Sequence, residues 1–313
     1  MKDQGSEPCV QEESPSHVIT YVKLTLVAAL WGGTFVAGRI VAETLAPLHA
    51  AIGRFAIATL LLLVLSWVIE GGLPRLNWRQ LVVTCVLGAT GIFLYNVSFF
   101  TALSYIPAGR TALFVALNPI VTALILAAFF HERLSPQQWF GIFIALCGAI
   151  IVISRGDIAA MVEDVSSSFG FGELAMMCAV LSWAAYTIIG RYALKGLSPI
   201  AATTYAALWG LALLILVSLV ITQAPIPDAI SWGAGLCLFY LGAFGTVIAF
   251  IWYYQGLKKI GAARVAIFNN LVPVFGVFQA FLFLDEPLLA SMIIGGVLVM
   301  AGVTLTNRKI SVS

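Results

Sequence analysis

Few residues of this sequence belong to the types that carry catalysis, and those few do not gather. The three histidines, His17, His49 and His131, lie far apart, and neither an acidic cluster nor a nucleophile motif accompanies them. An active site needs such groups within reach of one another. The five cysteines likewise show neither CxxC nor metal-ligand spacing. The sequence therefore argues against a metal centre, and we expect no cofactor.

The most informative polar residue is Arg54, which stands inside a long apolar stretch about seven residues beyond Pro47. At a rise of 1.5 Å per residue, it lies roughly 10 Å along a helix that starts at Pro47. A guanidinium group offers a forked pair of donors, so one hypothesis is that Arg54 binds a carboxylate or other anionic group. The alternative is that it pairs with Glu43 or helix-end carbonyls, or snorkels outward, and serves folding or gating.

Side-chain amides accompany two prolines in apolar stretches. Asn118 precedes Pro119, while Asn269 and Asn270 lie shortly before Pro273. Proline cannot donate a backbone hydrogen bond and kinks a helix, which frees a carbonyl one turn earlier. Two kinked helices with amides at the same depth indicate a central binding site. The amides alternatively bond only to neighbouring helices, which contributes about 0.6 to 2 kcal/mol each.

Three further residues are candidates for the lining of a cavity. Trp183 and Tyr186 are three positions apart and share one helix face. Asn96 is expected at a comparable depth in another helix. Since many aromatic residues of membrane proteins belong to interfacial belts instead, both interpretations stay open.

Three glutamates are gating candidates: Glu43, Glu132 and Glu286. The last two fall at predicted helix ends near Arg133 and Asp285, where capping or pairing within a turn is the alternative role. None of the predicted helices carries a carboxylate at its centre. The sequence therefore indicates no clear proton carrier.

The elements that position these residues follow from composition. The chain of 313 residues is 61% hydrophobic and only 10% charged, whereas soluble chains are nearer one quarter charged. Continuous apolar runs without a period of two exclude a β-barrel and predict an all-α integral membrane protein. With roughly 20 residues per span, we count ten transmembrane helices: 18–38, 47–69, 78–103, 109–130, 136–153, 170–193, 199–221, 231–257, 263–284 and 288–305.

The distribution of charge predicts the orientation. With the N-terminus in the cytoplasm, only Arg39, Arg110 and Arg155 lie outside, and the remaining loop arginines and lysines lie inside. Basic residues accumulate on cytoplasmic loops, so we expect an inner-membrane protein with both termini inside. The predicted parts are a disordered cytoplasmic tail, a first repeat, a periplasmic linker, a second repeat and a short cytoplasmic tail: 1–17, 18–154, 155–169, 170–307 and 308–313.

The two halves of the chain resemble each other. The matches fall at nearly constant offsets and include rare residue types, which disfavours chance; examples are Trp31 with Trp183, Pro119 with Pro273, and Glu132 with Glu286. Because each half holds five predicted spans, an odd number, the second half enters the membrane from the opposite side. Such inverted repeats are typical of transporters that expose a midplane site to each side in turn.

Residues 111–153, TALFVALNPIVTALILAAFFHERLSPQQWFGIFIALCGAIIVI, resemble the signature of EamA domains in the drug/metabolite transporter superfamily, and residues 265–305 repeat the pattern. LWGGTFVAGR at 30–39 and the pair Arg54 and Phe55 are also similar to that family. The resemblance covers nearly the whole chain and implies export of amino acids or related metabolites. One departure is Ala206, which stands at the position equivalent to Arg54 where the family pattern often repeats the arginine.

The function indicated is therefore secondary transport of small metabolites across the inner membrane by alternating access. A passive channel, or an integral-membrane enzyme acting on a lipid-linked substrate, is the alternative. We expect a small-molecule substrate and the lipid bilayer as partners, no nucleic acid, and a possible homodimer. Small residues in the fifth and tenth spans fit close helix packing or subunit contact: Gly141, Ala145, Gly148, Gly295 and Gly302.

Overall fold

A computed structural model of the protein describes residues 15–130, 134–157, 169–193, 196–221, 230–260, 265 and 268–307. All regular elements within these ranges are helices, which confirms the all-helical prediction. The predicted tail 308–313 lies outside the described residues. So do most of the predicted tail 1–17 and of the linker 155–169.

The helices of the first half begin where the sequence supplies helix-starting residues. Proline occupies the first position of α2 and of α7, and Asn77 and Ser135 each form a capping box with a glutamine three residues later. The elements are α1 (Pro15–Ala42), α2 (Pro47–Glu70), α3 (Trp78–Leu87), the π-helix η1 (Gly88–Leu94), α4 (Tyr95–Tyr105), α5 (Ala108–Val115), α6 (Asn118–Phe130) and α7 (Pro136–Ile153).

The second half repeats this order, including a π-helix in the equivalent place. Its elements are α10 (Phe171–Ala193), α11 (Pro199–Ile221), α12 (Trp232–Phe239), the π-helix η2 (Tyr240–Ile248), α13 (Ala249–Ile260), α15 (Leu271–Leu284) and α16 (Ala290–Asn307). The sequence predicted the stretches 78–103 and 231–257 as single helices. It did not predict the π segments at their centres.

Within the described residues, eight helical stretches are long and apolar enough to cross a membrane, and they correspond to the first eight predicted spans. The stretches Leu271–Leu284 and Ala290–Thr306 are apolar but shorter. A bilayer core about 30 Å thick takes roughly 17 to 25 helical residues. The chain is thus a multi-pass membrane protein, and the ninth and tenth spans stay predictions.

The structure divides the predicted span 109–130 into two helices. The backbone N–H groups of Ala116 and Leu117 bond to carbonyls three residues earlier, at 3.2 and 3.0 Å, which ends α5. Pro119 then occupies the second position of α6, where its missing N–H costs no helical hydrogen bond. Pro273 likewise lies third in α15. Each proline therefore stands near the start of a helix and does not kink the middle of one.

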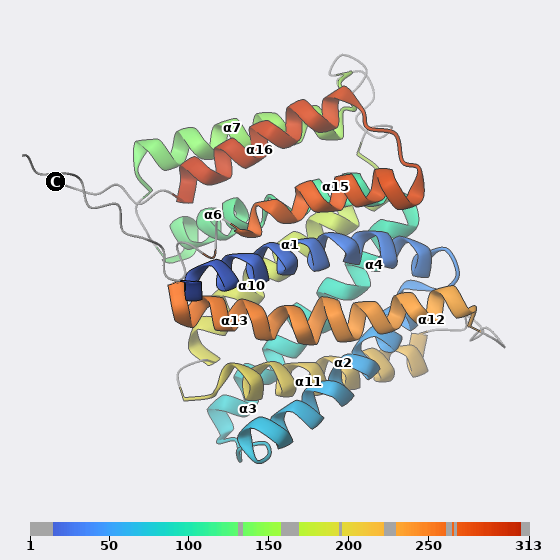
Figure 1. Ribbon diagram of the computed structural model, residues 1–313, viewed down its shortest axis with the longest axis vertical. Helices are drawn as coiled ribbons and strands as arrows, with labels where there is room; N and C mark the ends of the chain where they lie inside the picture. Colours follow the sequence, from blue (N-terminus) through green and yellow to red (C-terminus); the bar gives the residue numbers. More distant parts are fainter. Residues whose placement is uncertain are drawn as a thin grey trace, which may run out of the picture.

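The two repeats interlock. Helix α1 packs mainly on α15 and α13 of the second repeat, and α10 packs mainly on α4 and α6 of the first. Helix α2 lies beside α11, and α7 and α16 run side by side at one edge of the bundle (Figure 1). Each repeat thus buries its first helix against the other repeat, so neither half encloses its core alone.

Helices α7 and α16 approach closely because small residues face each other. A Cβ atom added to Gly148 would lie 2.6 Å from the carbonyl oxygen of Gly295, and one added to Gly302 would lie 2.6 Å from the backbone nitrogen of Ala145. Close approach of backbones is how small residues join helices in a membrane. The predicted small-residue faces therefore serve packing within the chain, and a homodimer would use other surfaces.

This packing predicts a destabilising effect of Gly148→Ala. The added methyl group meets backbone atoms that cannot rotate away, so we expect the free energy of unfolding in detergent to fall by about 1–3 kcal/mol. Gly233→Ala in α12 is the matched control, since a Cβ there meets nothing within 4 Å. Its helix should gain about 0.5–1 kcal/mol. Equal effects of the two substitutions would contradict the close α7–α16 contact.

Candidate functional site

Arg54 lies on α2 with only 8% of its surface exposed. Its Nη1 donates to Oδ1 of Asn96 at 3.0 Å, and its Nη2 donates to Oγ1 of Thr246 at 3.4 Å. The alternative that Arg54 pairs with Glu43 is wrong, because the Glu43 carboxylate pairs with Arg39, one helical turn before it, at 3.1 Å. Arg54 therefore joins α2, α4 and η2 through neutral acceptors.

The charge of Arg54 has no counterion in the part of the chain that the structure describes. The ion pairs found there join Arg39 to Glu43 and Arg110 to Glu173, and neither involves Arg54. Its Nε is buried and has no hydrogen-bond partner among those residues. Burying a charge is costly unless an opposite charge and hydrogen bonds compensate it. The guanidinium is thus a buried cation whose hydrogen bonds and charge are both incompletely satisfied.

The orientation of Asn96 follows from the π-helix that precedes it. Its Nδ2 donates to the carbonyl of Ile92 at 2.8 Å and to that of Gly91 at 3.4 Å. A π-helix shifts backbone bonds from the fourth to the fifth preceding residue and often marks a functional site. With its NH₂ group turned back onto η1, Asn96 presents its amide oxygen to Arg54.

Thr246 holds the other side of Arg54 and lies within η2. Its hydroxyl donates to the carbonyl of Leu241, five residues earlier, at 2.9 Å and accepts from Arg54. Thr246 belongs to the second repeat, whereas Arg54 and Asn96 belong to the first. The guanidinium is therefore hydrogen-bonded to both repeats, next to both π segments.

Each π segment receives a hydrogen bond from the first helix of the opposite repeat. Trp31 of α1 donates through its indole N–H to the carbonyl of Gly245 in η2, at 3.0 Å. Ser182 of α10 donates through its hydroxyl to the carbonyl of Thr90 in η1, at 2.7 Å. Trp31 and Ser182 occupy adjacent positions of the aligned repeats. The same kind of hydrogen bond is thus made twice, once from the first repeat to the second and once from the second to the first.

Glycines of the π segments allow this approach in both repeats. The positions are aligned: Gly91 faces Tyr186 as Gly245 faces Thr34, and Gly88 faces Ala206 as Gly242 faces Arg54. A Cβ on Gly88 would lie 2.7 Å from the Ala206 carbonyl oxygen, and one on Gly242 would lie 3.0 Å from that of Arg54. The backbone scaffold is therefore two-fold symmetric around the site, although its side chains are not.

A row of aromatic rings starts at Tyr95, which precedes Asn96 in the sequence. The rings of Tyr95 and Trp183 lie 5.1 Å apart and those of Trp183 and Tyr186 5.3 Å apart, in tilted arrangements. Tyr95 also interacts electrostatically with Arg54. The structure thus joins Asn96 to Arg54 directly and connects Trp183 and Tyr186 to them through the ring of Tyr95. Their role in binding stays a prediction.

The other predicted amides do not join this cluster by hydrogen bonds. Asn118, at the start of α6, is 8% exposed, and its Oδ1 has no partner among the described residues. Asn269 shares a hydrogen bond with Tyr253, and Asn270 donates to Thr304 on α16 at 3.3 Å. The single site that we expected from the two sets of amides is therefore dispersed over different helix contacts.

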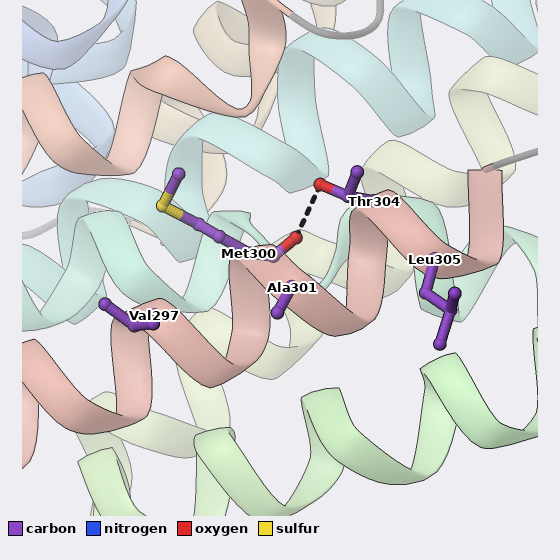
Figure 2. Close-up of a pocket in the computed structure, with 5 residues that line it drawn as sticks. All are labelled: Val297, Met300, Ala301, Thr304 and Leu305. Atoms are coloured by element: carbon purple, nitrogen blue, oxygen red, sulfur yellow. Dashed lines mark hydrogen bonds between the residues drawn. The ribbon is translucent and has the colours of Figure 1, made fainter.

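A groove of about 410 Å³ runs along α16 (Figure 2). All of its lining residues belong to α16, so it is separate from the Arg54 cluster. The Thr304 hydroxyl is its polar group, and it bonds back to the carbonyl of Met300 at 2.7 Å. Val297, at one end of the groove, is 61% exposed. An apolar, open lining on an apolar helix of a membrane protein is suited to contact with lipid. The lining residues are Val297, Met300, Ala301, Thr304 and Leu305.

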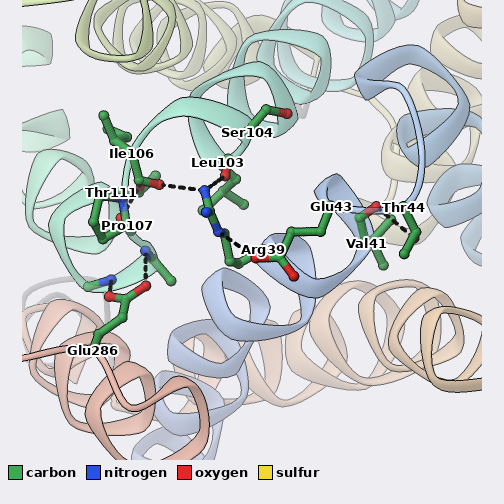
Figure 3. Close-up of polar contacts among 12 residues, drawn as sticks. Arg39, Val41, Glu43, Thr44, Leu103, Ser104, Ile106, Pro107, Thr111 and Glu286 are labelled. Atoms are coloured by element: carbon green, nitrogen blue, oxygen red, sulfur yellow. Dashed lines mark hydrogen bonds and ion pairs between the residues drawn. The ribbon is translucent and has the colours of Figure 1, made fainter.

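Charged side chains at one end of the bundle bond to backbone groups, and one of these contacts joins the two repeats (Figure 3). The Glu286 carboxylate, beyond the end of α15, accepts from the backbone N–H groups of Ala108 and Gly109 at 2.7 and 2.9 Å. It thereby caps the first turn of α5, where unpaired N–H groups and the helix dipole favour an anion. Arg39 donates to the carbonyl of Leu103 beside it. Glu132, the aligned partner of Glu286, lies outside the described residues.

A second inter-repeat contact is a buried ion pair. Nη1 of Arg110 on α5 lies 2.8 Å from Oε1 of Glu173 on α10, and both side chains are 5% exposed. Nη2 of Arg110 also donates to the carbonyl of Ile153, and Glu173 accepts from the backbone of Gly170 at 3.0 Å. This pair satisfies its charges internally, in contrast to Arg54.

Sequence reasoning missed Thr246 and the hydrogen-bonding roles of Ser182 and Trp31. A hydroxyl in an apolar run is a weak signal by itself. The stronger signal was the alignment of Gly88 and Gly91 with their counterparts in the second half, which marks two positions of close backbone approach. Reading the polar neighbours of those glycines would have drawn attention to Thr246.

Two stretches of the chain, residues 19–154 and 170–308, match the model of the EamA-like transporter family. An uncharacterized transporter of Bacillus subtilis (strain 168), YyaM, is 31% identical over 95% of this chain and 96% of its own. A probable terminal-alkyne amino-acid exporter of Streptantibioticus cattleyicolor is 27% identical over 91% of this chain and 92% of its own. A solved crystal structure, 19% identical, shares the fold at a TM-score of 0.65 over 92% of this chain and 97% of that one.

The two ion pairs yield a matched prediction about stability. Glu173→Gln leaves the buried Arg110 charge without its anion, so we expect a loss of about 3 kcal/mol in the free energy of unfolding. Glu43→Gln removes the carboxylate of the exposed pair, where Glu43 is 59% exposed, and should cost about 0–1 kcal/mol. Denaturant unfolding in detergent measures both variants. A larger loss for Glu43→Gln would contradict this assignment.

Proposed function

Since the chain belongs to the EamA-like transporter family, we propose that it is a secondary transporter that exports small carboxylate-bearing metabolites, foremost amino acids, by alternating access. The family predicted from the sequence is confirmed by the match of both halves. Substrate, direction and mechanism are the proposed part. The observation that carries the proposal is Arg54, a buried cation between the repeats that has no counterion among the described residues.

The chemistry of this site favours a carboxylate. Arg54 keeps a buried, unpartnered Nε beside an Nη2 that is held only by a 3.4 Å contact. A carboxylate accepts two parallel N–H bonds from a guanidinium and supplies the missing charge. The faces of Tyr95 and Trp183 nearby suit an apolar side chain or an ammonium group. An amino acid combines these features, and one relative is named as an amino-acid exporter.

We further propose ten spans arranged as inverted repeats in the inner membrane, with both termini in the cytoplasm. Eight apolar helical stretches, two shorter ones and the doubled family match support this arrangement. So does the bias of basic residues toward one set of loops. In such a transporter, the contacts of Glu286 and of the Arg110–Glu173 pair, which join the repeats at one end, would break when that end opens.

The substrate proposal predicts the behaviour of Arg54 variants in proteoliposomes. Counterflow with a panel of L-amino acids should be saturable for the wild type, and amides that lack the carboxylate should not exchange. Losing a charge-assisted contact should lower kcat/KM of Arg54→Gln about 10- to 100-fold, while Arg54→Lys retains part of the activity because it keeps the charge. Arg75→Gln, on an exposed loop arginine, is the control and should behave as wild type.

Two results would count against this proposal. Unchanged exchange by Arg54→Gln at normal folded yield would remove the carboxylate-binding role. Linear, non-exchanging flux through the wild type would show a channel instead of a carrier. If Arg54→Gln fails to fold, the comparison of amino acids with their amides in the wild type still decides the issue.

The topology proposal predicts labelling of single introduced cysteines, in a background without the five native ones. A cysteine at Ser313 should react with a membrane-impermeant maleimide only after the inner membrane of cells is permeabilised. One at Asp157, between the repeats, should react in spheroplasts that have an intact inner membrane. Reaction of both positions on the same side would exclude an odd number of spans between the linker and the C-terminus.

A further inference from the structure

We propose that Thr246 competes with the substrate carboxylate for Arg54, so that binding releases the second repeat from the first. This inference rests on the proposed function and names a positioning residue within the same site. It follows from the way in which the donors of Arg54 are divided among their neighbours.

The guanidinium offers five N–H donors in a planar fork. Nη1 is held by Asn96 at 3.0 Å, an ordinary distance, whereas Nη2 reaches Thr246 only at 3.4 Å. Nε has no partner among the described residues. Nε and Nη2 share one edge of the fork, which is the edge that a carboxylate binds in a bidentate manner. The contact with Thr246 is therefore the weaker of the two, and it occupies the edge of Arg54 that a carboxylate would bind.

When a carboxylate arrives, Thr246 cannot move away from Arg54 independently of the helix around it. Its hydroxyl donates to Leu241 within η2 at 2.9 Å. The adjacent Gly245 is held by Trp31 through its carbonyl, and a Cβ on Gly245 would lie 2.6 Å from the side chain of Thr34. Displacing Thr246 from Arg54 thus means displacing this part of η2.

Binding of the carboxylate affects the two repeats differently. Arg54 and Asn96 lie in the first repeat, and their mutual bond survives when the carboxylate arrives. The bond to Thr246 is the one that joins Arg54 to the second repeat. A substrate that replaces Thr246 removes a polar inter-repeat contact at the site itself, which is the differential interaction that a ligand needs to shift a conformational equilibrium.

The test uses the full chain in detergent with sodium propionate as a minimal carboxylate, against sodium chloride at equal concentration. Thermal stabilisation yields the half-saturating concentration. Thr246→Val removes the competing oxygen, so this concentration should fall about three- to tenfold relative to wild type. Thr246→Ser keeps the oxygen and should match wild type. Arg54→Gln should show no response to propionate.

The matched control is Thr90→Val. Thr90 lies in η1, and its hydroxyl donates to the carbonyl of Val86 at 2.8 Å, so the substitution removes the same kind of backbone bond without touching Arg54. It should leave propionate affinity unchanged. Hydrogen–deuterium exchange provides a second readout: propionate should speed exchange of peptides covering 240–248 in the wild type and have no such effect in Thr246→Val.

The outcomes separate the two proposals. An unchanged or weaker response of Thr246→Val, with Arg54→Gln unresponsive, would overturn the competition and leave the role of Arg54 standing. A full response of Arg54→Gln, or none by the wild type, would overturn carboxylate binding at Arg54 and this inference with it. Tighter binding by Thr90→Val as well would assign the effect to helix loosening and also overturn the competition.

Discussion

The fold depends on the requirement that backbone carbonyls within a membrane find donors inside the protein. The π segments η1 and η2 displace the regular helical bonds at the centre of the bundle. Trp31 and Ser182 then supply donors from the first helix of the opposite repeat. The packing of α1 on the second repeat and of α10 on the first follows from the same arrangement. Satisfying the backbone therefore ties the two halves together at the point where a moving transporter must rearrange.

The site arises where this symmetric scaffold carries unequal side chains. Gly88 approaches the backbone of Ala206 as Gly242 approaches that of Arg54, so the two positions have equivalent surroundings. Only one of them bears a guanidinium group. Arg54 thus contacts both repeats, and the equivalent position in the second repeat, Ala206, carries no second charge. In the alternating-access mechanism that we propose, such a position would allow one small molecule to interact differently with the two conformations.

The sequence predicted the helical fold and the family with its doubled organisation, because apolar run length and internal matches depend on local composition. It did not predict the π segments, since a shift of one residue in bonding leaves the apolar pattern intact. It assigned Glu43 to Arg54 as an alternative, although Arg39 one turn away is better placed for a pair. The sequence predicted one site for Asn118, Asn269 and Asn270, but these amides lie at different helix contacts. The direction of a side chain, unlike its depth, depends on how its helix is rotated in the folded bundle.

The contrast between Arg54 and Arg110 indicates what distinguishes a site from a structural contact here. Arg110 is neutralised by Glu173 at 2.8 Å, and an added anion would gain little from it. Arg54 is held by an amide and a hydroxyl oxygen, which satisfy N–H groups but leave the charge in place. In a medium of low dielectric constant, that remaining charge attracts an anion more strongly than it would in water. Neutral partners thus keep Arg54 folded into the bundle and leave its charge available to the carboxylate that we propose as its ligand, whereas a resident glutamate would neutralise that charge.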